Sequence, residues 1–298
     1  MTTNDSAASP SPEVLRYAAF TTDPAGGNPA GVVLDAAGLD DAAMPAIAAR
    51  LGYSETAFLT ARNPGAPGTA EPVYDVRYFA PKAEVPFCGH ATVAAAVALA
   101  ERDGTGAGGY LFATPAGEVP VAVDTVGGVP RATLTSVAPH VEAAGADDVA
   151  EALAALDWSA DELDADLPPR IAFAGARHLV IAAATRDRLA RLDYDVPRLE
   201  ALMRRLGLTT VQLVRRASAD VFHVRDPFPV GGVVEDPATG AAAAAFGAYA
   251  RELGLVPATS VLTLHQGEDM GRPGVLTVTL REGDERVRVS GTAVRIPA

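Results

Sequence analysis

The chain has little cysteine, lysine and aromatic content. Its 298 residues include one cysteine, Cys88, so no intramolecular disulfide can form, and this favours a reducing, cytoplasmic compartment. Among the 24 basic residues only Lys82 is a lysine. Lys82 follows Pro81 in a turn, and nothing around it suggests the apolar pocket that would activate its amine. Schiff-base and pyridoxal phosphate chemistry are therefore not expected.

Positive charge and long apolar runs are also scarce. The chain has 37 acidic and 24 basic residues and a net charge of −13, which opposes attraction to nucleic acids and to anionic membranes. No run of about 18 apolar residues predicts a membrane span, and residues 1–12 lack the basic and apolar regions of a signal peptide. We expect no nucleic-acid or membrane partner and a flexible tail over residues 1–12.

The spacings that identify metal and cofactor sites are missing. The five histidines show no helical pairing, and Cys88 has no second thiol, so the spacing of a zinc site is absent. A Gly-x-Gly-x-x-Gly pattern at 104–109 follows a predicted helix, whereas the dinucleotide fingerprint follows a strand. The sequence predicts no metal and no cofactor, so the chemistry would come from side chains and backbone alone.

Two Ala-rich segments form the clearest pattern in the chain. Residues 91–102 and 238–253 are small or apolar at nearly every position, which predicts two buried helices. An Ala-Thr pair opens each segment, at 91–92 and 238–239, about half a chain length apart. Strands are predicted before and after both helices. The sequence therefore predicts an α+β fold of two pseudo-symmetric domains, each a barrel-like mixed sheet wrapped around one central helix.

The length of 298 residues fits two domains. We place the N-terminal domain at 13–128 and the C-terminal domain at 129–285. The last strand, about 286–298, is a candidate to complete the N-terminal domain.

The starts of these two helices are the first candidate site. A helix N-terminus presents free N–H groups and the positive end of its dipole, so it can bind a carboxylate. Two facing starts, at 87–92 and 234–240, could hold a small molecule with two polar ends. Taken singly, the residues also fit ordinary roles: Asp236 a helix N-cap, Gly89 a turn glycine and His90 a structural histidine.

Glu55 is a further candidate, beside the two helix starts. It stands where a predicted helix over 39–51 gives way to a strand, beside the apolar residues 57–59. Partial burial there would raise its pKa toward that of a proton shuttle, although a surface glutamate at a strand start is the alternative. The neighbouring Ser54 lacks the closing glycine of a nucleophile elbow and fits a turn residue.

With these residues in view, the chain resembles the PhzF-like isomerases of phenazine biosynthesis, within the diaminopimelate epimerase-like fold. The resemblance runs nearly the full length and depends on five motifs in order. They are FTTDPAGGNPAGVVL at 20–34, SETAF at 54–58, YFAPKAEVPFCGHAT at 78–92, EDPATG at 235–240 and QGEDMGRP at 266–273.

The resemblance implies a cofactor-independent enzyme, usually a homodimer, with its site in the cleft where the two helix starts meet. Glu55 would take a proton from a small carboxylated metabolite and return it elsewhere on the same molecule, while His90 and Asp236 hold or relay charge. Backbone N–H groups of the glycines at the helix starts would bind the carboxylate or a developing oxyanion. The implied substrate-binding residues are Cys88, Gly89, Thr239, Gly240, Ala241 and, at the rim of the cleft, Asn28.

Two departures from the family pattern leave alternatives open. Ala241 stands where many relatives carry serine, so a hydroxyl donor to the substrate carboxylate is missing and the substrate stays open. The epimerases of this fold use one cysteine from each helix start, and this chain has only Cys88. A racemase or epimerase using Cys88 with Asp236 or Glu55 is one alternative, and a catalytically silent metabolite-binding protein is another.

Overall fold

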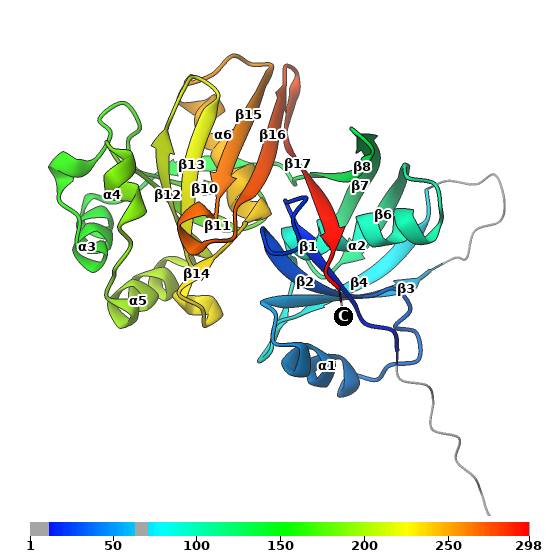
Figure 1. Cartoon of the computed structure of the whole chain (residues 1–298). Coiled ribbons are helices and arrows are strands. Elements are labelled where there is room, and N and C mark those ends of the chain that lie inside the picture. The colour runs from blue at the N-terminus through cyan, green and yellow to red at the C-terminus, as the bar shows by residue number, and fades with distance from the viewer. Residues whose placement is uncertain (1–11, 63–70, 298) are drawn as a thin grey trace, which may run out of the picture.

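A computed structural model describes residues 12–62 and 71–297, which form two barrel-like halves beside one another (Figure 1). The predicted tail over residues 1–12 lies outside the described part except for Pro12. Within that part, no helix is long and apolar enough to cross a membrane.

In the N-terminal half, eight strands among the described residues pair into a closed ring around one helix. Neighbours around the ring follow the order β1, β2, β3, β4, β6, β7, β8 and β17, and β17 pairs again with β1. A short strand, β5, pairs antiparallel with the end of β4. The strands are β1 (Leu15–Ala19), β2 (Asn28–Val33), β3 (Glu55–Ala61), β4 (Val73–Phe79), β5 (Glu84–Val85), β6 (Gly108–Thr114), β7 (Gly117–Val126), β8 (Val129–Thr135) and β17 (Asp284–Arg295).

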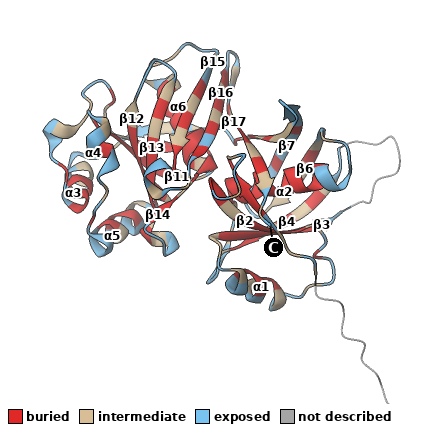
Figure 2. Cartoon of the chain, viewed as in Figure 1, coloured by how far each residue is buried: buried red, intermediate tan, exposed pale blue. Residues whose placement is uncertain are grey.

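The helix inside this ring is α2 (Gly89–Arg102), and it is buried on every side from Gly89 to Ala100. Its small alanine side chains let the sheet approach all around it, so close packing here needs no amphipathic face (Figure 2). The other helix of this half, α1 (Ala43–Leu51), packs outside the ring against β3 and β4.

The C-terminal half repeats the succession of strands around α6 (Gly240–Glu252), but among the described residues no strand pairing closes it into a ring. An additional layer of helices covers the outer face of β11 and β12 and forms a separate apolar core there. The strands are β9 (His140–Ala143), β10 (Arg170–Phe173), β11 (Arg177–Ala182), β12 (Thr210–Arg216), β13 (Val221–Pro227), β14 (Glu235–Asp236), β15 (Ser260–Gln266) and β16 (Gly274–Arg281); the helices are α3 (Ala146–Leu156), α4 (Arg186–Ala190) and α5 (Val196–Leu206), with short 3-10 turns at Ala160–Glu162, Pro229–Gly231 and Glu268–Met270.

Matching strand registers relate the two halves residue by residue. Before α2, Tyr78 pairs with Val85, and before α6, Asp226 pairs with Asp236. In both halves the strands that follow one another around the sheet alternate antiparallel and parallel in the same succession. The predicted α+β fold with two pseudo-symmetric, barrel-like halves is confirmed.

The register of the repeat differs from the one that the sequence suggested. The two Ala-Thr pairs at 91–92 and 238–239 are not equivalent, because Gly89 and Gly240 are the first residues of the two helices. Cys88 therefore corresponds to Thr239. Similar alanine runs cannot fix a register, whereas the paired strands before each helix do.

Strand pairing also moves the boundary between the halves. The boundary placed at 128 and 129 falls in the tight turn of the β7–β8 hairpin, where Gly127 and Gly128 both have positive φ angles. β8 pairs with β17 on its other side, so the chain leaves the N-terminal half only after Thr135. β17 pairs with β16 as well as with β1 and β8, and thus belongs to both halves. A Gly-Gly pair is typical of a hairpin turn rather than of a linker.

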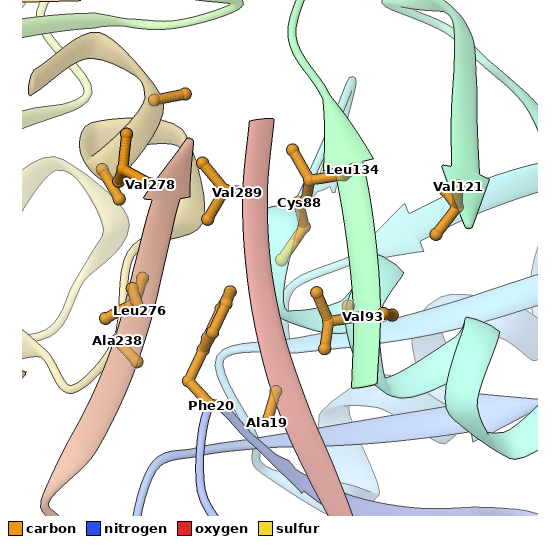
Figure 3. Close-up of a cluster of buried hydrophobic side chains, with 14 of the residues drawn as sticks. Ala19, Phe20, Cys88, Val93, Val121, Leu134, Ala238, Leu276, Val278 and Val289 are labelled. Atoms are coloured by element: carbon orange, nitrogen blue, oxygen red, sulfur yellow. The ribbon is translucent and has the colours of Figure 1, made fainter. Parts of the chain in front are cut away.

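The two halves share one hydrophobic core at their junction. Phe20 lies there beside β16 and β17, with Leu276 and Val289 close to it, and Cys88 and Leu134 lie on the other side of β17 (Figure 3). Phe20 has a φ of 64°, a left-handed conformation that is uncommon for an aromatic residue. Its backbone is held there by bonds from Phe20 N to Thr292 O and from Val275 N to Phe20 O. The junction is thus built from fixed backbone as well as apolar packing.

Candidate active site

The N-termini of the two central helices meet at this junction. A Cβ atom added to Gly89 would lie 3.2 Å from the Cα of Gly240, and one added to Gly240 would lie 3.5 Å from the Cα of Gly89, so the two helix starts are in direct contact. In the described part of the chain, neither N-cap side chain, Cys88 or Thr239, accepts a bond from its own helix. The N-cap side chains therefore do not occupy the first N–H groups of either helix, which an anion could bind.

A cleft of about 480 Å³ opens beside these helix ends. Eight of the nine predicted site residues line it, and three phenylalanines form much of its apolar wall. The predicted residues are Glu55, Cys88, Gly89, His90, Asp236, Thr239, Gly240 and Ala241, and the phenylalanines are Phe87, Phe173 and Phe228.

Glu55 is the first residue of β3 and is 8% exposed. The chain enters β3 after α1, and the left-handed conformation of the C-cap residue Gly52 ends that helix. Burial raises the pKa of Glu55 to about 7, and the charge of Asp236 acts in the same direction, while hydrogen bonds involving Ser54 and Cys88 lower it. Glu55 can therefore both accept and release a proton near neutral pH.

His90 lies beside the Glu55 carboxyl. Its Nε2 lies 3.5 Å from Glu55 Oε2 and 3.3 Å from Ser54 Oγ, and its Nδ1 lies 3.1 Å from Asn28 Nδ2 and 3.3 Å from Cys88 Sγ. Burial lowers the pKa of His90 to about 3, so the imidazole is neutral at neutral pH. A neutral ring can relay a proton between neighbours, but it carries no charge that would stabilise an anion.

Asp236 lies opposite, on the short strand β14. Burial raises the pKa of its carboxyl to about 6, while bonds from Thr239 Oγ1 (2.6 Å) and Asn28 Nδ2 (2.8 Å) lower it. The other titratable groups near it are Glu55, Cys88, Glu235 and Asp226, and His90 shares the Asn28 amide with it. The cleft thus holds two buried acids, one from each half, and both titrate closer to neutral pH than ordinary carboxyls.

Asn28 is the one predicted residue that does not line the cleft, although its amide contacts Asp236 and His90. The rim position expected for it is wrong, because Asn28 is 1% exposed and does not line the cleft. Its amide instead joins the halves by donating to Asp236 Oδ1 (2.8 Å) and to Ala238 O (3.0 Å). The two buried glycines before it, Gly26 and Gly27, let the loop pass inward at the junction.

Two residues of the site were not predicted as functional. Ser54, expected to be a turn residue, contacts the His90 ring. Gln266 caps the start of α6: its Oε1 accepts from Thr239 N at 2.9 Å, and its Nε2 donates to Asp236 O at 2.8 Å. Both stand within the quoted motifs, but a polar residue in a motif does not reveal which backbone group it meets.

Three of the cleft residues also form a possible set of metal ligands. The ligand atoms of Glu55, Cys88 and His90 all lie within 4.8 Å of one another. A carboxylate, a thiolate and an imidazole are ligands that zinc accepts. Sequence spacing could not show this group, because Glu55 lies far from the other two along the chain.

Fold and site together define an isomerase of the two-barrel class, with paired acids where two helix ends meet. The chain belongs to the phenazine biosynthesis-like (PhzC-PhzF) family, whose model matches residues 17–297. It is 34% identical over 290 residues to an uncharacterized isomerase of Deinococcus radiodurans, covering 96% of this chain and 90% of that protein. It is 30% identical over 280 residues to the trans-2,3-dihydro-3-hydroxyanthranilate isomerase of Pseudomonas fluorescens, covering 93% and 94%.

Solved structures agree with this assignment. The chain superposes on a predicted epimerase of Pseudomonas aeruginosa with a TM-score of 0.82, at 28% identity and with 96% and 98% coverage. A hydroxyproline epimerase from Agrobacterium vitis, 12% identical with a TM-score of 0.63 and 95% and 90% coverage, shares the fold alone.

Proposed function

We propose that this chain is a cofactor-independent isomerase that moves a proton within a small carboxylated metabolite, with Glu55 as the proton shuttle. The observation that carries the proposal is the Glu55 carboxyl, which is buried in the cleft with a pKa of about 7, beside a neutral His90 and two helix N-termini. A base with a pKa near the working pH combines a useful ionised fraction with a strong drive for proton transfer.

The proposed reaction is balanced within one molecule. The Glu55 carboxylate takes a proton from an activated carbon, so the substrate becomes an anion and Glu55 a carboxylic acid. Glu55 then returns the same proton to another carbon, while N–H groups at the starts of α2 and α6 hold the substrate carboxylate. Proton transfer of this kind contributes about 10²- to 10⁴-fold, and fixed orientation of the substrate supplies much of the rest.

The pseudo-symmetry favours one base over two. A racemase that uses a thiol from each helix start would need a second thiol at the position equivalent to Cys88, and Thr239 stands there. The Thr239 hydroxyl already donates to Asp236. Burial and the charge of Glu55 also raise the pKa of the Cys88 thiol well above its usual value, so little thiolate is present to act as a base.

The substrate class follows from the cleft and from one relative. We propose a small acid with an apolar or cyclic body, since phenylalanines line much of the wall and the helix ends suit a carboxylate. The relative from Pseudomonas fluorescens is named for a cyclic hydroxy amino acid. Ala241 offers no hydroxyl to such a substrate, so we expect its carboxylate to depend on backbone N–H groups.

The test is proton NMR in D2O with a pool of small amino and cyclic hydroxy acids, including trans-2,3-dihydro-3-hydroxyanthranilate. The wild type should exchange carbon-bound hydrogen in at least one compound, and Glu55→Gln should slow that exchange by about 10²- to 10⁴-fold. Exchange that survives Glu55→Gln would move the base to Cys88 or Asp236. Ligand-induced thermal stabilisation without any exchange would favour a silent binding protein.

A further inference from the structure

The connection between β15 and β16 is longer than its counterpart in the N-terminal half. It spans residues 267–273, between Gln266 and Gly274, whereas the equivalent strands of the N-terminal half, β6 and β7, are joined by residues 115–116 alone. This connection carries most of the fifth sequence motif. Residues 267–273 take no part in the proposed reaction. We refer to residues 266–275 as the bridging segment.

One end of the bridging segment holds the backbone that supplies Asp236. The side-chain amide of Gln266 accepts from Thr239 N and donates both to Asp236 O and to Thr239 Oγ1. Gln266 is 1% exposed. Gln266 thus links the start of α6 to the strand before it.

The other end holds the loop that supplies Asn28. The Arg272 guanidinium donates from Nε to Gly27 O at 2.9 Å and from Nη2 to Gly26 O at 2.8 Å. Gly27 N donates to Pro273 O at 3.0 Å. Three hydrogen bonds therefore fix the two peptides directly before Asn28.

The segment is folded so that both ends can bind at once. Gly267 has a φ of 78°, and a Cβ atom there would lie 2.3 Å from Arg272 O, so this turn requires glycine. Gln266 and Arg272 are brought back toward each other across it. The two segments that Gln266 and Arg272 hold are also in contact, because Asn28 Nδ2 donates to Asp236 Oδ1 across the junction.

We propose that Arg272 is a positioning residue, which holds the Gly26–Gly27 backbone so that the Asn28 amide stays bonded to Asp236 across the two halves. The consequence for turnover depends on the proposed function, but the geometric claim does not. A bidentate arginine suits this task, since its planar fork holds two carbonyl oxygens in a fixed geometry that the single ammonium of a lysine does not impose.

The expected consequence concerns the acid in the cleft. The bond from Asn28 stabilises the charged form of Asp236, so loosening it should raise the pKa of that carboxyl further above its present value. It should also slow the reaction more than it weakens substrate binding, because a misplaced group near the reacting atoms costs up to about 10²-fold.

The test compares Arg272→Gln and Arg272→Lys with Arg186→Gln. Arg186 binds Asp269 of the same segment at the surface, so its loss controls for a general disturbance of the segment. A carbon-13 NMR titration of the aspartate carboxyls needs no substrate. In Arg272→Gln the pKa of Asp236 should rise by about half a unit or more, in Arg272→Lys by less, and in Arg186→Gln it should not move.

With a substrate in hand, Arg272→Gln should lower kcat by about 10- to 100-fold with KM nearly unchanged. It should add little to the loss caused by Asn28→Ser, because both changes break the same contact. An unchanged pKa of Asp236, or fully additive losses, would overturn the proposal. If Arg272→Gln does not fold, the titration of Arg272→Lys decides. A wild type without turnover would contradict the proposed function alone, since the titration still tests the contact.

Discussion

The two halves carry the same ion pair at the same place in the repeat, yet only one of the pairs is buried. Arg225 and Glu235 join β13 to β14 with side chains 9% and 5% exposed, whereas Arg77 and Glu84 join β4 to β5 at 36% and 34%. The carbonyl of Ala190 at the end of α4, in the helical layer of the C-terminal half, accepts a bond from Arg225. In the N-terminal half, Arg77 instead binds the exposed Asp41 just before α1. The repeat thus sets the positions, and the added helices decide which pair is removed from water.

The same comparison explains where the chemistry lies. Strand register places Thr210 in the C-terminal half at the position of Glu55, and Val85 in the N-terminal half at the position of Asp236. Each half therefore contributes one acid, at positions that are not equivalent. A symmetric scaffold with an asymmetric pair of acids suits intramolecular proton transfer better than a two-base racemase, which needs matched groups on both sides.

The two ion pairs give the largest expected difference. Arg225→Met should destabilise the protein by about 3–5 kcal/mol, because Glu235 would stay buried without a partner. Arg77→Met, its matched control, should cost no more than about 1 kcal/mol, because water replaces the exposed pair. Urea unfolding of both variants checks this. Equal costs would contradict the assigned difference in burial.

A smaller effect concerns how stability depends on pH. The pKa of Glu55 is raised from 4.5 to about 7 in the folded state, so the folded protein holds this proton more tightly than the unfolded chain does. Its contribution is present below pH 4.5 and is lost as the pH rises through about 7. Glu55→Gln should therefore be more stable than the wild type near pH 8, by on the order of 2–3 kcal/mol.

Chemical denaturation at about pH 5 and pH 8 measures this difference. Thr210→Ser, a conservative change at the equivalent position of the other half, should keep the pH dependence of the wild type. If Glu55→Gln also keeps that dependence, the raised pKa belongs to another group.

The smallest expected effect concerns the thiol. Cys88→Ala should lower turnover by less than about tenfold, because a hydrogen bond that Cys88 shares with Glu55 adjusts the base without replacing it. Steady-state rates at saturating substrate check this. A loss of about 10³-fold or more would favour a racemase in which Cys88 is a second base.

Much of this arrangement could be predicted from sequence. The central helices follow from their alanine-rich, apolar sequence, since a helix that is apolar on every face is buried. The pairing of Glu55 with the helix starts came from motifs in order along the chain. Three features could not be predicted because they depend on contacts between distant segments. They are the buried position of Asn28, the Gln266 cap and the difference in burial between the two ion pairs. Composition cannot reveal which of two similar pairs a helix from elsewhere in the chain will cover.

The proposed chemistry depends most on the pKa of the Glu55 carboxyl. Carbon-13 NMR titration of the glutamate side chains, assigned with Glu55→Gln, measures this pKa without a substrate. We predict that the pKa of Glu55 is about 7 and that of no surface glutamate approaches it. A value near 4.5, the ordinary one for glutamate, would contradict the claim that this buried carboxyl is a base ready for proton transfer.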